Sequence, residues 1–262
     1  MVTAPILDNK QPSSPSVFAP AALLREARRQ KALAAVDVPR MCLLDPDGDI
    51  VHWLRETGQA KPFGDWPCYH TELHSFTLGG HEVGIVGRVV GASFAVLVAE
   101  ELFASGCRLL VSLTSAGQIT PVGKPPYFVV IDRALRDEGT SYHYVAPSEF
   151  AEADPHLIAE AKGALAQVAL RSVVGPSWTT DAPFRETAEA IEAARRKGIL
   201  AVEMEAAALY AFAKAQAQSV LCLAHVTNAM GQNGDDFEKG ERDGAADAMR
   251  LLAAIIRRLA PT

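Results

Sequence analysis

The stretch 199–216 changes abruptly from one kind of secondary structure to another. Its first four residues, 199–202, are apolar and typical of a short buried strand. An alanine-rich run with high helix propensity follows at 206–216. Glu203 and Glu205 stand at the junction, where a carboxylate among apolar residues needs a polar partner. The junction therefore predicts either a polar ligand site or a helix start whose dipole favours acidic residues.

Apolar runs and helix-like segments alternate along most of the chain. This alternation predicts one α/β domain at 21–262, with a parallel or mixed sheet between helices, and a mobile arm at 1–20, which is rich in Pro and Ser. The expected strands are 41–44, 75–78, 82–86, 108–113, 127–131, 172–174, 199–202 and 220–226. The expected helices are 21–34, 92–104, 155–168, 188–197, 206–216 and 245–259. Because ligands of such sheets bind where strands end, the Glu203–Glu205 junction is the first candidate site.

Charge and cysteine content exclude several function classes. The net charge of -6 gives no broad basic surface, so nucleic acid is not an expected partner. The four cysteines are widely spaced without a C-x-x-C pair, which argues against a zinc site or a disulfide framework and favours a reducing cytoplasm. No apolar run reaches membrane-spanning length, and no secretion signal is visible. Neither a metal nor an organic cofactor is expected.

Three further segments carry groups that suit a ligand. Residues 114–117 (Thr-Ser-Ala-Gly) predict either a cradle of N–H groups for an anion or sugar, or a plain tight turn. The segment 175–187 joins aromatic and hydrogen-bonding side chains, which suits a flat heterocycle or, alternatively, a capped helix start. Asn228 ends the last strand and offers both a donor and an acceptor. His143 is either a ligand contact or, more commonly for a lone histidine, structural.

These motifs together resemble the nucleoside phosphorylase family, which includes uridine phosphorylase, bacterial-type purine nucleoside phosphorylase and the methylthioadenosine nucleosidases. Residues 202–209 (Val-Glu-Met-Glu-Ala-Ala-Ala-Leu) resemble the Glu-Met-Glu signature of that family. The resemblance covers roughly residues 75–260 and implies a three-layer α/β/α fold whose mixed sheet partly closes into a barrel. The other motifs in family order are the Gly87–Gly91 turn, Ser115-Ala116-Gly117, Phe184-Arg185 and Asn228.

The resemblance implies a role for each group at the junction. Glu205 would bind the ribose 2′ and 3′ hydroxyls, with Met204 beneath the sugar and Glu203 beside it. The base would be bound by Thr180, Phe184, Arg185 and Asn228. Glu205 and Asn228 are the expected catalytic residues: the first stabilises positive charge on the ribose, and the second receives negative charge from the leaving base.

The nucleophile is the less determined part of this reading. The resemblance implies inorganic phosphate, which needs positive charge and N–H donors to be held. The candidate phosphate ligands are Gly48, Arg88 and Ser115, with Arg55 or the Arg40 of a neighbouring subunit as substitutes. Two features depart from the family: Ser112 stands where phosphorylases usually carry Arg, and Asp45, Asp47 and Asp49 crowd the first loop.

Three functions remain open on this reading. A phosphorylase that releases base and ribose 1-phosphate is favoured, because Asn228 replaces the acidic group with which nucleosidases protonate the base. A nucleosidase that uses water, or a non-catalytic nucleoside-binding protein, are the alternatives. Asn228 favours an oxo-base such as uracil or hypoxanthine, although adenine or a modified base stays open. A homodimer or hexamer that serves nucleoside salvage in the cytoplasm is expected.

Overall fold

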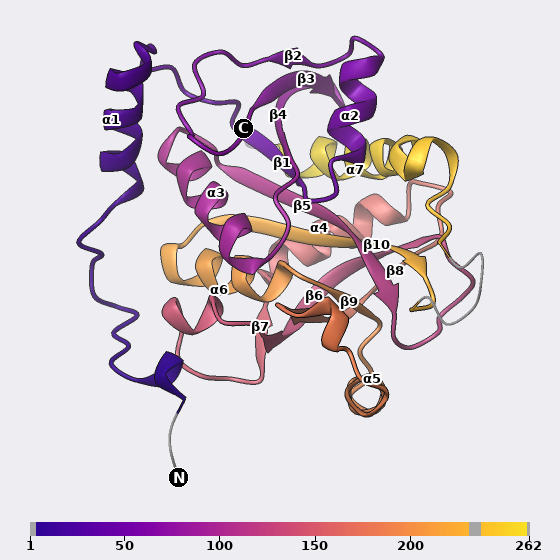
Figure 1. Cartoon of the computed structure of the whole chain (residues 1–262). Coiled ribbons are helices and arrows are strands. Elements are labelled where there is room, and N and C mark those ends of the chain that lie inside the picture. Colours follow the sequence, from indigo (N-terminus) through magenta and orange to yellow (C-terminus); the bar gives the residue numbers. More distant parts are fainter. Residues whose placement is uncertain (1–3, 231–236, 261–262) are drawn as a thin grey trace.

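The core of the protein is a 10-stranded mixed sheet (Figure 1). The computed structural model describes residues 4–230 and 237–260. Its strands are β1 (Met41–Asp45), β2 (Lys61–Pro62), β3 (His74–Leu78), β4 (His81–Gly87), β5 (Leu109–Gln118), β6 (Tyr127–Asp137), β7 (Phe150–Glu152), β8 (Ser172–Thr180), β9 (Ala201–Glu203) and β10 (Ser219–Asn228). Its α-helices are α1 (Pro20–Lys31), α2 (Asp49–Glu56), α3 (Ala92–Ala104), α4 (Pro155–Leu165), α5 (Ala188–Arg196), α6 (Ala206–Gln216) and α7 (Ala245–Leu259).

Part of the sheet closes on itself. The strand order is β10-β6-β8-β9-β5-β1-β4-β3-β2, β7 pairs with β6, and β10 also pairs with β5. The strands β5, β10, β6, β8 and β9 therefore form a closed barrel, and β1, β4, β3 and β2 continue from β5 as an open wing. The predicted mixed, partly barrel-like sheet is confirmed.

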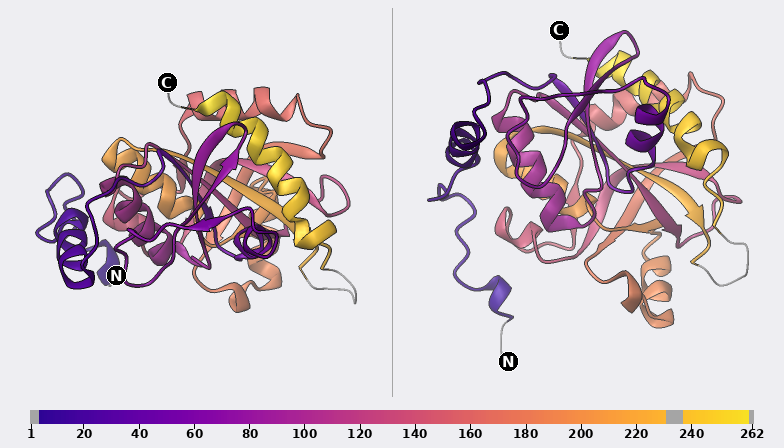
Figure 2. Two further views of the ribbon diagram at one scale, coloured as in Figure 1. Left: turned by 90° about the horizontal axis from the view of Figure 1, so that it is seen from above. Right: turned by 45° about the horizontal axis from the view of Figure 1, so that its top comes forward.

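Helices cover both faces of the sheet, as the predicted three-layer arrangement requires. Helices α3 and α6 pack against each other on one side, and α4 packs against α7 on the other (Figures 1 and 2). Every residue of α6 from Ala206 to Phe212 is buried, which its alanines permit because small side chains let the helix lie close to the sheet. Burying one large side chain such as Phe212 contributes about 1.5–3 kcal/mol. Helix α5 projects away from the barrel beside β9 (Figure 1).

Several strands are longer than the sequence predicted: β6 runs to Asp137 where 127–131 was expected, and β5 and β8 extend through segments expected as turn and loop. Strand β5 continues through residues 114–117, which were expected to form a turn, because Gly117 pairs with Val202 of β9 on one side and Asn228 of β10 on the other. Strand β8 continues through residues 175–180, expected as loop, because these residues pair with β6 and β9. Both segments are polar or glycine-containing, so their strand character comes from barrel closure and not from local propensity.

The N-terminal segment runs outside the body of the fold. Residues 4–19 are almost all exposed and lead along one side to α1 (Figure 2). Residues 1–3 of the predicted mobile arm lie outside the described residues, and its mobility stays a prediction. All four cysteines are buried and unpaired, as expected for Cys107 and Cys222. Within residues 4–230 and 237–260, none of the helices combines the length and apolarity needed to cross a membrane.

Candidate active site

Glu203 is held by four hydrogen bonds inside the protein. One carboxylate oxygen accepts from the hydroxyls of Ser177 (2.9 Å) and Thr179 (2.6 Å) on β8. The other accepts from the backbone N–H groups of Glu205 (2.7 Å) and Ala206 (2.8 Å) at the start of α6. Glu203 therefore ties β8 to the first turn of α6 and satisfies N–H groups that a helix leaves unpaired. The predicted ribose contact of Glu203 stays a prediction, and its oxygens already have internal donors.

Glu205 is buried with fewer donors than Glu203. The residue is 1% exposed; one carboxylate oxygen accepts from the Gly91 N–H at 2.7 Å, in the turn before α3, and the other accepts from the Met204 N–H at 3.3 Å. Burial and then the neighbouring charge of Glu203 raise the pKa of Glu205 to about 8, while the Gly91 N–H and Thr114 act in the opposite direction. Burial also raises the pKa of Glu203, but its four donors favour the ionised form. We therefore assign the negative charge to Glu203 and, below about pH 8, a proton to Glu205.

The ends of β9 and β10 meet at Gly117. A side chain added at Gly117 would lie 3.2 Å from Val202, which precedes Glu203, and 3.5 Å from the Asn228 amide oxygen. The structure thus brings Asn228 next to the Glu203–Glu205 junction. The Asn228 oxygen accepts from the Met230 N–H at 2.9 Å, and its amide nitrogen donates to the Thr227 hydroxyl at 3.2 Å. A backbone N–H can only donate, so this bond fixes which way the amide points.

The predicted base-binding residues are divided between two environments. Thr180 is buried at the end of β8, where its hydroxyl accepts from the Ala182 N–H at 3.1 Å. Phe184 and Arg185 lie in a short 3-10 helix (Pro183–Arg185) before α5, and Phe184 is 98% exposed. Met204 is half-buried between the two glutamates. A stacking role for Phe184 stays a prediction, since nothing in the described chain covers its ring.

The loop after β1 meets β5 through Asp47. Its carboxylate accepts from both the backbone N–H and the hydroxyl of Ser115, each at 2.7 Å. Asp45 is buried beneath this contact and accepts from the Val51 N–H at 2.8 Å. Burial raises the pKa of Asp45 to about 7. The Ser115 donors predicted for phosphate are therefore engaged by a carboxylate of the protein.

Few positive charges lie near this loop. Lys239 forms an ion pair with Asp49, and the exposed Arg88 lies across Gly48. His225 is buried, and burial lowers its pKa to about 4, so it is neutral at pH 7. The structure thus brings together the three predicted phosphate ligands, Gly48, Arg88 and Ser115. The group that they surround is the Asp47 carboxylate.

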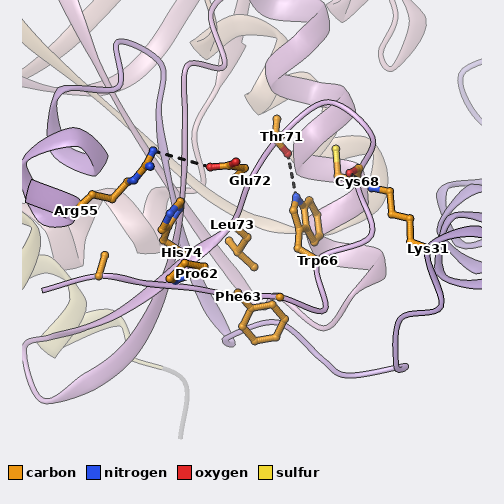
Figure 3. Close-up of a pocket in the computed structure, with 12 residues that line it drawn as sticks. Lys31, Arg55, Pro62, Phe63, Trp66, Cys68, Thr71, Glu72, Leu73 and His74 are labelled. Atoms are coloured by element: carbon orange, nitrogen blue, oxygen red, sulfur yellow. Dashed lines mark hydrogen bonds and ion pairs between the residues drawn. The ribbon is translucent and has the colours of Figure 1, made fainter. Parts of the chain in front are cut away.

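Arg55 lines a different cavity. It lies 3.9 Å from Glu72 and lines a cavity of about 530 Å³ together with His74 and Trp66 (Figure 3). This cavity contains none of the other residues predicted for the site. The substitute role of Arg55 as a phosphate ligand is therefore not supported within the described chain. Among the other candidates, His143 lies 3.2 Å from Lys10 of the N-terminal segment, which is a structural contact.

Sequence reasoning missed several groups that shape the site. Ser177 and Thr179 were assigned to a loop, although they are the hydroxyl donors to Glu203. The Gly91 N–H was seen only as part of a turn, and Asp47 only as a charge that repels phosphate. The one available signal was the Thr-Ser-Ala-Gly run, which predicted N–H groups for an anion; in the structure the Ser115 N–H of this run donates to the Asp47 carboxylate.

Comparison with known proteins gives consistent matches. A model of the phosphorylase superfamily matches residues 40–257. A uridine phosphorylase of Thermococcus kodakarensis is 25% identical over 236 residues, which cover 83% of each chain. A DeoD-type purine nucleoside phosphorylase of Psychromonas ingrahamii is 25% identical over 179 residues, covering 68% of this chain and 75% of that protein.

Solved structures share the fold at low sequence identity. The purine nucleoside phosphorylase of Toxoplasma gondii, in complex with immucillin-H, gives a TM-score of 0.74 at 14% identity, covering 87% of this chain and 94% of that one. The uridine phosphorylase of Vibrio fischeri gives 0.70 at 21% identity, covering 85% and 92%.

Proposed function

This chain belongs to the phosphorylase superfamily, and we propose that it cleaves the N-ribosidic bond of a ribonucleoside. The observation that carries the proposal is the Glu205 carboxyl. It is buried where β9 passes into α6, and within the described residues it forms no ion pair. A buried carboxyl with spare acceptor capacity is suited to ribose hydroxyls.

The chemistry follows from how charge moves when the bond breaks. Positive charge develops on the ribose, as in other glycosidic cleavages, and the electron pair leaves with the base. An ionised Glu205 that accepts from the 2′ and 3′ hydroxyls orients the sugar and stabilises this charge. Asn228 lies next to the junction, and its second amide N–H, for which the described residues provide no acceptor, is the group that would receive negative charge from the base.

The orientation of Asn228 supports an oxo-base as substrate. Because the Met230 N–H holds the amide oxygen and Thr227 takes one amide hydrogen, the other hydrogen has no partner among residues 4–230 and 237–260 and can serve as a donor. A donor pairs with a ring carbonyl, as in uracil or hypoxanthine, and not with the amino group of adenine. Asn228→Asp is expected to lower kcat/KM for inosine or uridine about 10- to 100-fold while affecting adenosine less. Equal losses for all three nucleosides would contradict this base assignment.

The pKa of Glu205 predicts the pH dependence of cleavage. Its folded-state pKa is raised to about 8, so the ionised, active form is the minority below that pH. We expect kcat/KM to rise about tenfold per pH unit up to pH 8 and then level off, because kcat/KM reports groups of the free enzyme. The measurement is a pH–rate profile with a nucleoside that does not titrate in this range. A flat profile between pH 6 and 8 would exclude Glu205 as the titrating group.

Phosphate and water are both chemically able to complete the cleavage. Phosphorolysis, with inorganic phosphate as co-substrate, is supported by the phosphorylase names of the relatives. The contact between Asp47 and Ser115 favours water. The decisive test of cleavage itself is a panel of nucleosides with and without phosphate, in which release of free base is followed by chromatography. Tight binding in a thermal-shift assay without base release would instead indicate a nucleoside-binding protein.

We further propose a homodimer or hexamer, as the family resemblance implies, in the reducing cytoplasm. The four unpaired cysteines are compatible with that compartment. Multi-angle light scattering at micromolar concentration is expected to give a mass of at least twice 28.0 kDa. A monomer under these conditions would remove the expectation that a neighbouring subunit completes the site.

A further inference from the structure

The groups around Ser115 allow the nucleophile to be identified. Building on the proposed cleavage of a ribonucleoside, we infer that water is the nucleophile and that Asp47 is the base that activates it. The Asp47 carboxylate occupies the position predicted for phosphate. The chain would then be a nucleosidase on a phosphorylase fold.

The first argument is the occupancy of the donors. An oxyanion is bound through N–H and O–H groups, and Ser115 supplies one of each. Both bind Asp47, one to each carboxylate oxygen, at 2.7 Å. Phosphate would have to displace this carboxylate and would then face its charge at close range. Because the contact joins the first loop to β5 across 68 residues of sequence, it is part of the tertiary fold and not a local turn.

The second argument is the charge of the surroundings. Among the residues that the structure describes, four aspartates and a single cation, Lys239, line the cavity beside Ser115. That cation is already paired with Asp49. The buried hydroxyl of Ser112, where phosphorylases usually carry Arg, has no hydrogen-bond partner in the described chain. A phosphate dianion therefore meets a net negative cavity, which opposes its binding, whereas a neutral water does not.

The third argument is size. The cavity has a volume of about 20 Å³. One water molecule needs at least about 10–15 Å³ of such space, and it also needs two to four polar partners. Asp47, Thr114, Ser115 and His225 supply such partners on the cavity wall. The space thus suits one ordered water and is too small for phosphate without movement of the loop.

In this inference the carboxyls of Asp47 and Glu205 have different roles. Asp47 is exposed, so its proton can pass to solvent, whereas Glu205 is buried and holds the sugar. Asp47 binds Ser115 on β5, and the preceding residue, Thr114, acts on Glu205 by a hydrogen bond that lowers its pKa, so the two carboxyls contact adjacent residues of one strand. The carbon attacked by the nucleophile is bonded to the carbon that carries the 2′ hydroxyl, so a base near Glu205 is suitably located.

The step is balanced as a hydrolysis. The water oxygen forms a bond to the anomeric carbon and gives one proton to Asp47. The bond between that carbon and the base nitrogen breaks, and its electron pair leaves with the base. The base then takes up one proton from solvent, since Asn228 can donate a hydrogen bond but not a proton, and Asp47 returns its proton to solvent. The products are free ribose and free base, and no co-reactant other than water is used.

The first test is product analysis with the wild-type protein. We expect the product to be free ribose. It should form at the same rate in phosphate-free buffer and in about 50 mM phosphate. Ribose 1-phosphate formed only when phosphate is present would overturn the inference while leaving the proposed cleavage intact, and Arg88→Ala should then raise the phosphate requirement.

The second test changes Asp47 itself. Asp47→Asn is expected to lower kcat about 10²-fold with little change in KM, as for loss of a general base. Formate should restore part of the activity of Asp47→Ala, because it returns a carboxylate to the vacated position. Asp247→Asn is the matched control, since it removes the charge of a half-buried aspartate that also acts on His225 but lies outside the cavity. Unchanged kcat in Asp47→Asn would overturn the base assignment.

The third test does not depend on turnover. Phosphate should raise the Tm of Asp47→Ala, whose Ser115 donors are free, and should leave the Tm of the wild type unchanged. An equal rise of Tm in both proteins would show that Asp47 does not occupy the position where phosphate binds, and would overturn the inference. If no nucleoside is cleaved, the proposed function fails, and this comparison still decides whether Asp47 excludes phosphate.

Discussion

Glu205→Gln is expected to lower kcat about 10³-fold in a protein that remains folded. Glutamine keeps the shape of the side chain and its acceptor for the Gly91 N–H, so the turn before α3 is preserved. It cannot carry the negative charge that stabilises a positively charged ribose. The effect should therefore fall mainly on kcat, and the steep rise of kcat/KM toward pH 8 should disappear.

The stability of the same variant provides an independent check. A carboxyl whose folded-state pKa is raised from 4.5 to about 8 is favoured in its protonated form, so it lowers stability progressively as pH rises through this window. Glutamine resembles the protonated form at every pH. The free energy of unfolding of Glu205→Gln should thus equal or exceed that of the wild type at pH 8, and the difference should vanish near pH 4.

A second buried glutamate offers the control for these measurements. Glu101 on α3 is 2% exposed, and burial raises its pKa while the nearby Cys68 thiol acts in the opposite direction. Glu101→Gln should raise stability at pH 8 in the same direction but leave kcat within about twofold of the wild type. If Glu205→Gln behaves like Glu101→Gln in both respects, Glu205 is only a buried carboxyl and does not act on the ribose.

The parts of the fold that the sequence predicted are those with strong local patterns. Apolar runs placed β1, β4, β6 and β10, and alanine content placed α6 within its observed bounds. The polar ends of β5 and β8 were missed because their strand geometry depends on partners from distant segments. Barrel closure is a property of pairing between strands, which no local window of sequence contains.

For the site, as for the fold, the sequence predicted the locally framed residues but not their long-range contacts. The junction residues Glu203, Met204 and Glu205 were found because the apolar run and the helix start frame them in sequence. The distinction between the two glutamates was not predictable, since it depends on Ser177 and Thr179, which lie 26 and 24 residues away. The contact of Asp47 with Ser115 was likewise hidden, although both residues had been singled out separately.

The most damaging substitution for stability is expected at Glu203. Glu203→Ala removes the acceptor of four buried donors: two hydroxyls of β8 and two N–H groups at the start of α6. Each buried donor left unpaired costs about 1–3 kcal/mol, although the hydroxyls can turn toward other acceptors. We expect a loss of about 4 kcal/mol in the free energy of unfolding, measured by urea denaturation.

Glu203→Gln separates this structural role from a direct role in catalysis. Its amide oxygen can still accept from the Glu205 and Ala206 N–H groups, while its NH₂ faces the two hydroxyls. Thr179 also accepts from the Ala207 N–H, so its oxygen is only partly available and the fit is imperfect. A loss of about 1–2 kcal/mol is therefore expected. Since Glu203 positions Glu205 through the shared helix start, activity should follow folding across the two variants. A Glu203→Ala protein as stable as the wild type but inactive would instead place Glu203 in direct contact with the substrate.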